Sequence, residues 1–102
     1  TNLDRILKDE RLTDEDFIEI QNIVQDVHPN LFKRLNEVSK SKLSNLDLKY
    51  AAYIYLNMDN QQIANIMKIE PKTVRMAKYR MKQKIGLEKE IDLQTFIQNL
   101  EL

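Results

Sequence analysis

The 102-residue sequence has no cysteine and no tryptophan, and it has only one glycine, two prolines and one histidine. Without cysteine the chain can form no disulfide, no thiol nucleophile and no cysteine-ligated zinc site. One histidine is too few for a histidine-rich metal site, and one glycine is too few for a glycine-rich phosphate loop. No nucleophile–base pair stands out among the scattered carboxylates. We therefore expect no enzyme, no metal, no cofactor and no small-molecule substrate.

Long hydrophobic runs are also missing, because no apolar stretch reaches the ~18 residues that a membrane span needs. The first residue is Thr rather than Met, and no signal-peptide pattern follows it. We interpret the chain as a fragment of a longer protein and expect this fragment to be cytoplasmic.

The residues that are abundant favour helices. Leu, Ile, Lys, Glu, Asn and Gln are common, and no strand-like alternation is present. Hydrophobic residues make up 42% of the chain, which is enough for one small core. The composition predicts an all-α fold, a small helical bundle.

The charges balance over the whole chain but not along it. Lys and Arg total 16, as do Asp and Glu. Residues 1–48 carry seven basic and ten acidic side chains, whereas residues 49–90 carry nine basic and four acidic ones. Residues 72–84 hold six basic side chains and no acidic one. Such a local positive field attracts a phosphate backbone, although a charge run is more often a solvated helix face.

Residues 1–40 are expected to form a helical extension that includes a helical pair and acts as a connector or a dimerisation element. Thr13 is a candidate N-cap, and the following helix should end at His28 because Pro29 disfavours helical geometry there. The apolar stripe of this helix consists of Phe17, Ile20, Ile23, Val24 and Val27. The second helix begins at Pro29 or Asn30 and has an inner face of Leu31, Phe32, Leu35 and Val38. His28 is expected to pack or hydrogen-bond locally; the alternative is a pH sensor.

Local signals place four helices in residues 43–102. The residues expected to begin them are Ser44, Asp59, Pro71 and Asp92. Asp47 should close a capping box with Ser44. Asn57 and Gly86 suit the left-handed conformation that turns the chain after a helix. The polar segment 39–42 separates this region from the N-terminal pair.

A short helix up to residue 67, a turn at 68–70 and a longer basic helix at 71–85 form a helix-turn-helix pattern. A rotation of ~100° per residue gives the long helix two different faces. Its inner face consists of Val74, Ala77, Met81 and Ile85. Its outer face consists of Lys72, Arg75, Met76, Tyr79 and Gln83, flanked by Arg80 and Lys82.

This outer face has side chains of the kinds that contact DNA. Arg pairs with a guanine edge, Tyr and Met contact a thymine methyl, and Gln pairs with adenine. Flanking cations and Thr73 at the helix start can hold phosphates. The alternative is a basic amphipathic helix that is docked on a core or presented to an acidic protein. Lys78 is expected to lie toward the buried side of the helix, with only its charged end reaching solvent.

Residues 43–100 resemble the LuxR-type (GerE-like) helix-turn-helix output domain of bacterial transcription regulators. The family's stretches Leu-Thr-x-x-Glu, Gly-x-Ser-x-x-Glu-Ile-Ala, Ile-Ser-x-x-Thr-Val and Lys-Leu-Gly correspond here to residues 43–47, 57–64, 69–74 and 84–86. Glu70 departs from the family by replacing the Ser that caps the long helix. The resemblance implies a DNA-binding domain over residues 43–102.

The resemblance also assigns roles to individual positions. It implies base contacts by Arg75, Met76 and Tyr79. It implies phosphate contacts by Lys72, Thr73, Arg80, Lys82 and Gln83. Domains of this kind usually act as dimers through the last helix, where Leu93 and Leu100 are the possible dimer face, while Phe96 and Ile97 are expected to close the core.

Residues 17–100 further resemble a Bacteroidetes subgroup of these regulators. The similarity is carried by the stretches Val-His-Pro-Asn-Leu-Phe at 27–32 and Tyr-Arg-Met-Lys at 79–82. In that subgroup sensory modules, and often a membrane segment, lie upstream. The resemblance implies signal transduction by a longer, homodimeric regulator whose cytoplasmic end binds double-stranded DNA and which can be membrane-tethered.

Two other functions share some of these features. One is a promoter-reading domain like that of a sigma factor, which has the same fold but acts with core polymerase. The other is a protein-interaction module whose N-terminal helices bind a partner through Phe17 and Phe32.

Overall fold

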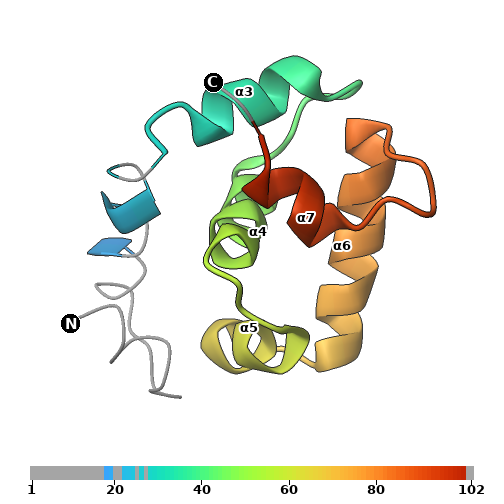
Figure 1. The fold of residues 1–102 in the computed structure, drawn as a ribbon. Coiled ribbons are helices and arrows are strands. Elements are labelled where there is room, and N and C mark those ends of the chain that lie inside the picture. The colour runs from blue at the N-terminus through green and yellow to red at the C-terminus, as the bar shows by residue number, and fades with distance from the viewer. Residues whose placement is uncertain (1–17, 20–21, 25, 27, 101–102) are drawn as a thin grey trace.

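The computed structural model describes residues 18–19, 22–24, 26 and 28–100, and these contain helices but no strand. The helices labelled in Figure 1 are α3 (Leu31–Val38), α4 (Asn45–Tyr55), α5 (Asn60–Met67), α6 (Pro71–Ile85) and α7 (Leu93–Gln98). The predicted all-α fold is confirmed. None of the described helices has the length and apolar character that crossing a membrane requires.

Side-chain caps begin three of these helices where the sequence predicts a start. At α4 the Ser44 hydroxyl accepts from the Asp47 N–H at 3.1 Å, and the Asp47 carboxylate accepts from the Ser44 N–H at 2.9 Å. Asp59 caps α5 in the same reciprocal way with Gln62. Asp92 caps α7 by accepting from the Thr95 N–H at 3.0 Å. These bonds satisfy N–H groups that have no partner within the helix.

Three residues with left-handed backbone conformation follow or end helices, and the sequence predicts two of them. Asn57 has a φ of 65° after α4, and Gly86 has a φ of 90° at the end of α6. Lys68 also has a positive φ, 58°, and it ends α5. Sequence reasoning predicted a turn at 68–70 but not that a lysine would take this conformation.

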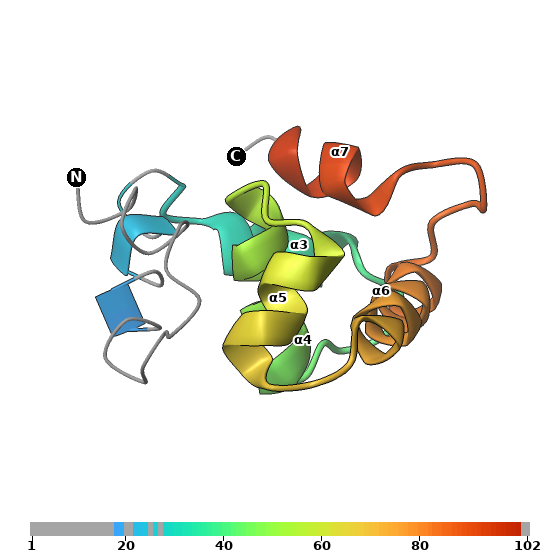
Figure 2. The same ribbon diagram turned by 90° about the horizontal axis from the view of Figure 1, so that it is seen from below.

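One hydrophobic core joins the described helices. Tyr53 and Ile54 of α4 are fully buried in it, and α7 contributes Ile97. Figures 1 and 2 show α4 in the middle, with α3, α7 and the α5–α6 pair arranged around it. Leu31 and Leu35 of α3 are buried in the same core.

The N-terminal extension is described only in part. Val24 is fully buried and Ile23 half-buried, whereas Thr13, Phe17, Ile20 and Val27 lie outside the described residues. The division of the chain into residues 1–40 and 43–102 stays a prediction. In the structure, Val24 and α3 share a core with the helices of residues 43–102. The role of the extension stays a prediction.

His28 packs between distant parts of the chain. Its ring is buried and makes an edge-on contact with Tyr55 at the end of α4. Its Nε2 donates a hydrogen bond to the carbonyl oxygen of Leu100, at 3.1 Å. The residue therefore links the segment before α3 to the segment after α7, a longer-range contact than the local one expected.

Candidate nucleic-acid interface

The helix-turn-helix consists of α5, the turn at 68–70, and α6. The turn closes when the Ile69 N–H donates to the Ala64 carbonyl at 3.0 Å. Pro71 then takes the first position of α6, where its missing N–H costs nothing. Among the labelled helices, α5 and α6 make the most extensive mutual contact. The short helix thus fixes the long one at the edge of the molecule (Figure 1).

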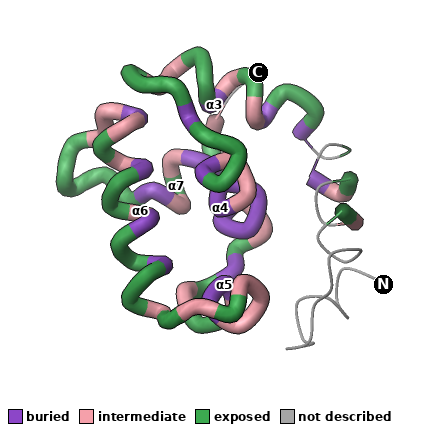
Figure 3. The backbone as a smooth tube through the Cα atoms, turned by 180° about the vertical axis from the view of Figure 1, so that it is seen from behind, coloured by how far each residue is buried: buried purple, intermediate pink, exposed green. Residues whose placement is uncertain are grey.

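Helix α6 has the two faces that its sequence predicts. Its buried side chains are Val74, Ala77, Met81 and Ile85. Its exposed side chains include Lys72, Arg75, Met76, Tyr79, Arg80 and Gln83. Figure 3 shows the exposed stretches of α6 on the outside of the molecule and the buried ones toward its interior. The predicted outer set is therefore one continuous surface.

Two large apolar side chains lie on this surface, Met76 at 51% and Tyr79 at 63% exposure. Exposed apolar residues are normal when scattered, but here they sit among cations around one shallow hollow. The residues lining the hollow are Lys72, Arg75, Met76, Tyr79, Arg80 and Gln83. Mixed cationic, amide and apolar groups on a convex helix can match the edges and methyl groups of a DNA groove.

The remaining candidates for phosphate contact are at the margins of this surface. Thr73 is exposed in the first turn of α6. Lys82 is half-buried, and its Nζ donates to the Lys89 carbonyl at 2.9 Å, which holds the loop after α6 against the helix. Burial lowers the pKa of Lys78, while the Asp92 and Asp59 carboxylates act in the opposite direction. Lys78 is half-buried, as its place on the helix wheel indicates.

The C-terminal end of α6 is bonded to the polar segment 39–42 and to α4. The Ser41 N–H donates to the Lys84 carbonyl at 2.9 Å, and the Lys84 Nζ lies 2.6 Å from Asp47 Oδ2. Burial raises the pKa of the Asp47 carboxyl, but hydrogen bonds from Lys84 and Ser44 and the Lys84 charge together hold it below its usual value. Sequence reasoning missed this arrangement, because nothing local pairs residues that are 37 positions apart.

The possible dimer face on α7 is partly used within the chain. Leu93 is buried in the core, with 5% exposure, and Leu100 is half-buried against it. Phe96 is half-buried and Ile97 fully buried. An apolar groove beside α7 is lined by Val38, Ile85, Leu87, Ile91, Phe96 and Leu100, with Arg34 and Lys40 among the charged residues around it. A dimer face here stays a prediction.

The chain is similar to a known protein family over part of its length. The family model GerE, described as bacterial regulatory proteins of the luxR family, matches residues 41–97. That range is more than half of the chain, and it runs from the polar segment 39–42 before α4 into α7. No curated protein and no solved structure matches the chain with significance.

Proposed function

The chain belongs to the luxR family of bacterial regulatory proteins and carries its DNA-binding helix-turn-helix, and from this premise we propose that α6 enters the major groove of double-stranded DNA. The observation that carries the proposal is the exposed surface of α6, where cations, an amide and two apolar side chains lie together on the side away from the core. A major groove admits one α-helix, and a recognition helix reads base edges with its exposed side chains.

Base reading is assigned to three residues. The Arg75 guanidinium can donate two hydrogen bonds to the O6 and N7 atoms of a guanine. Met76 and Tyr79 supply exposed apolar surface for thymine methyl groups. Arg75 and Met76 are adjacent on one turn of α6 and Tyr79 lies one turn further on, so the three would face neighbouring base pairs.

Phosphate contacts are assigned to Lys72, Thr73, Arg80, Lys82 and Gln83. These residues lie along and beside the base-reading surface, so they can reach the two backbones that border a groove. Their cations account for binding despite a formal net charge of zero, because a phosphate responds to the local field.

The chain is further proposed to be the cytoplasmic, DNA-binding end of a homodimeric regulator with sensory modules upstream. Two-fold pairing would place the two α6 helices about one DNA turn, ~34 Å, apart on a palindromic site. The α7 residues Leu93 and Leu100 are the proposed contribution of this chain to pairing.

The first test is fluorescence anisotropy of a labelled random duplex titrated with the 102-residue protein at several salt concentrations. Six neutralised phosphates would give a slope near −5 for log affinity against log salt. Site selection should show a sequence preference in the wild type that Arg75→Ala/Tyr79→Ala loses. Lys33→Ala on the exposed side of α3 is the matched control and should change neither quantity.

Absence of binding at low salt, for the protein itself and also for a forced dimer, would contradict the proposal. The protein-interaction role of the N-terminal helices would then be the better explanation. Binding to a promoter element only together with core polymerase would instead favour a sigma-factor-like role.

A further inference from the structure

Glu70 occupies the N-cap of α6 without capping it. Its backbone is extended and its side chain makes no hydrogen bond to the helix. At α4, α5 and α7, by contrast, the N-cap side chains Ser44, Asp59 and Asp92 all accept from the first turn. Glu has one methylene more than Asp and is not among the residues that cap well. The Glu70 backbone carbonyl accepts from the Thr73 N–H at 2.9 Å, so the residue contributes to the first turn of α6 through its main chain only.

The Glu70 carboxylate is consequently free. The residue is exposed, and within the described part of the chain its side chain has no hydrogen bond and no ion pair. It lies at the N-terminal end of α6, next to the part of the exposed surface that Lys72, Arg75 and Met76 form. A charged acceptor with no partner in the protein remains available to a donor on a ligand.

An acid at this place opposes general DNA binding. The phosphate backbone repels a carboxylate, so Glu70 weakens the affinity for every duplex unless a base compensates it. A group that penalises most sequences and rewards a few increases specificity rather than affinity.

On the basis of the function proposed above, we propose that Glu70 reads a cytosine by accepting a hydrogen bond from its N4 amine. The first residues of a recognition helix contact base edges, and carboxylates pair with cytosine N4 in the major groove. Adenine also offers an amine, but its N7 acceptor lies beside that amine and repels the carboxylate. The site recognised by α6 then has a cytosine at the end that faces Glu70.

The experiment compares wild type, Glu70→Gln and Glu70→Asp in site selection and in anisotropy with a random duplex. Gln pairs with adenine, so Glu70→Gln should move the preference at one position from cytosine toward adenine, with about tenfold lower discrimination for cytosine. Loss of the charge should also tighten random-duplex binding about two- to threefold at low salt.

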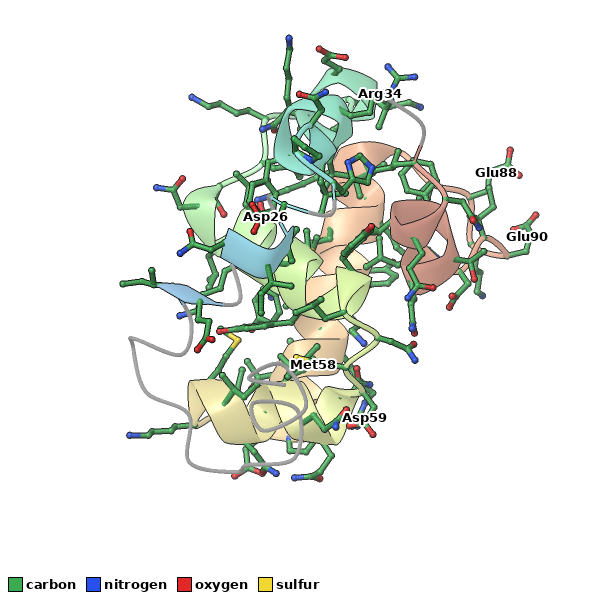
Figure 4. All side chains as sticks on the ribbon, turned by 60° about the vertical axis from the view of Figure 1, so that its left-hand side comes forward. Asp26, Arg34, Met58, Asp59, Glu88 and Glu90 are labelled. Carbon is green, nitrogen blue, oxygen red and sulfur yellow. The ribbon has the colours of Figure 1, made fainter. Side chains whose placement is uncertain are left out.

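Glu70→Asp keeps the negative charge but shortens the side chain, so it separates the effect of the charge from the effect of the side-chain length. Asp is a good N-cap, so its shorter carboxylate should fold back onto the first turn of α6. This variant should lose the cytosine preference, keep wild-type affinity for the random duplex and melt at a higher temperature. Glu88→Gln is the matched control, because Glu88 lies in the exposed loop after α6, far from α5 and Asp59 at its start (Figure 4). It should alter none of the three readouts.

The outcomes distinguish this inference from the proposed function. If wild type binds DNA with a sequence preference but selects no cytosine that depends on Glu70, the inference is overturned and the function stands. The same holds if Glu70→Gln tightens binding to all sequences equally and leaves base preferences unchanged. If wild type binds no duplex at all, the function itself fails.

Discussion

At the scale of single residues, Asp47 connects the start of α4 to the end of α6. It takes part in the capping box with Ser44 and in the ion pair with Lys84. Asp47→Asn keeps an oxygen that can accept from the Ser44 N–H but removes the charge that pairs with Lys84, so it should lower the free energy of unfolding by about 1 kcal/mol. Urea unfolding at pH 7 measures the loss. Lys84→Met is the control, because it removes the same ion pair from its other end and should cost about as much.

The same residue gives the stability a pH dependence. The pKa of Asp47 is lower in the folded chain than its ordinary value of 3.8, because the hydrogen bonds and charge around it outweigh the effect of burial. Its contribution is therefore complete above that ordinary value and is lost as the pH falls through the lower, folded pKa. Urea unfolding of wild type and Asp47→Asn should differ by a constant amount from pH 7 to about 5, and the difference should shrink below about 4. An undiminished difference at pH 2 would contradict this assignment.

At the scale of elements, α6 ends where Gly86 takes a φ of 90°. A Cβ there would be strained by the backbone and would lie 2.6 Å from Cδ of Lys40. Gly86→Ala should therefore cost about 1–2 kcal/mol of unfolding free energy, measured by thermal or urea unfolding. Adding Lys40→Ala relieves the contact but not the strain, so the double variant should recover only part of the loss. Gly86→Asn should lose less than Gly86→Ala, since Asn tolerates this conformation.

Helix ends in residues 43–100 could be predicted because each depends on a few neighbouring residues. Ser44 with Asp47 and Asp92 with Thr95 are bonds over three positions, and Gly86 needs only its own lack of a side chain. Lys68 could not be predicted in the same way. Lysine has no intrinsic preference for positive φ, and the reversal from α5 into α6 imposes it there.

At the scale of the molecule, the sequence predicts which side of α6 is exposed and which is buried. It does not predict the contacts between residues far apart in the chain. Periodicity over fifteen residues is enough to separate a buried from an exposed side. The ion pair of Lys84 with Asp47 and the bond from His28 to Leu100 span 37 and 72 positions. Such contacts follow from how the helices pack, and no local pattern encodes them. The sequence indicates that Glu70 stands where a capping Ser would be. Only the structure shows that its carboxylate has no hydrogen-bond or ion-pair partner among the described residues.

The packing of α3 leads to a prediction about the whole molecule. Leu35 is fully buried in the core that it shares with α4, α6 and α7, although it lies outside the residues that match the family. Leu35→Ala should therefore cost about 2–5 kcal/mol and lower one cooperative transition. The four tyrosines all lie between positions 50 and 79, so their near-ultraviolet signal reports the family-matched region, whereas far-ultraviolet circular dichroism reports all helices.

Both signals should shift together in Leu35→Ala, because α3 and the helix-turn-helix unfold as one unit if they share a core. Lys33→Ala, on the exposed side of the same helix, should stay within about 0.5 kcal/mol of wild type. A tyrosine midpoint that Leu35→Ala leaves in place would show two independent units. If the midpoints move together, a change that reaches α3 from upstream can alter the stability of the DNA-binding helices directly, since no flexible boundary separates them.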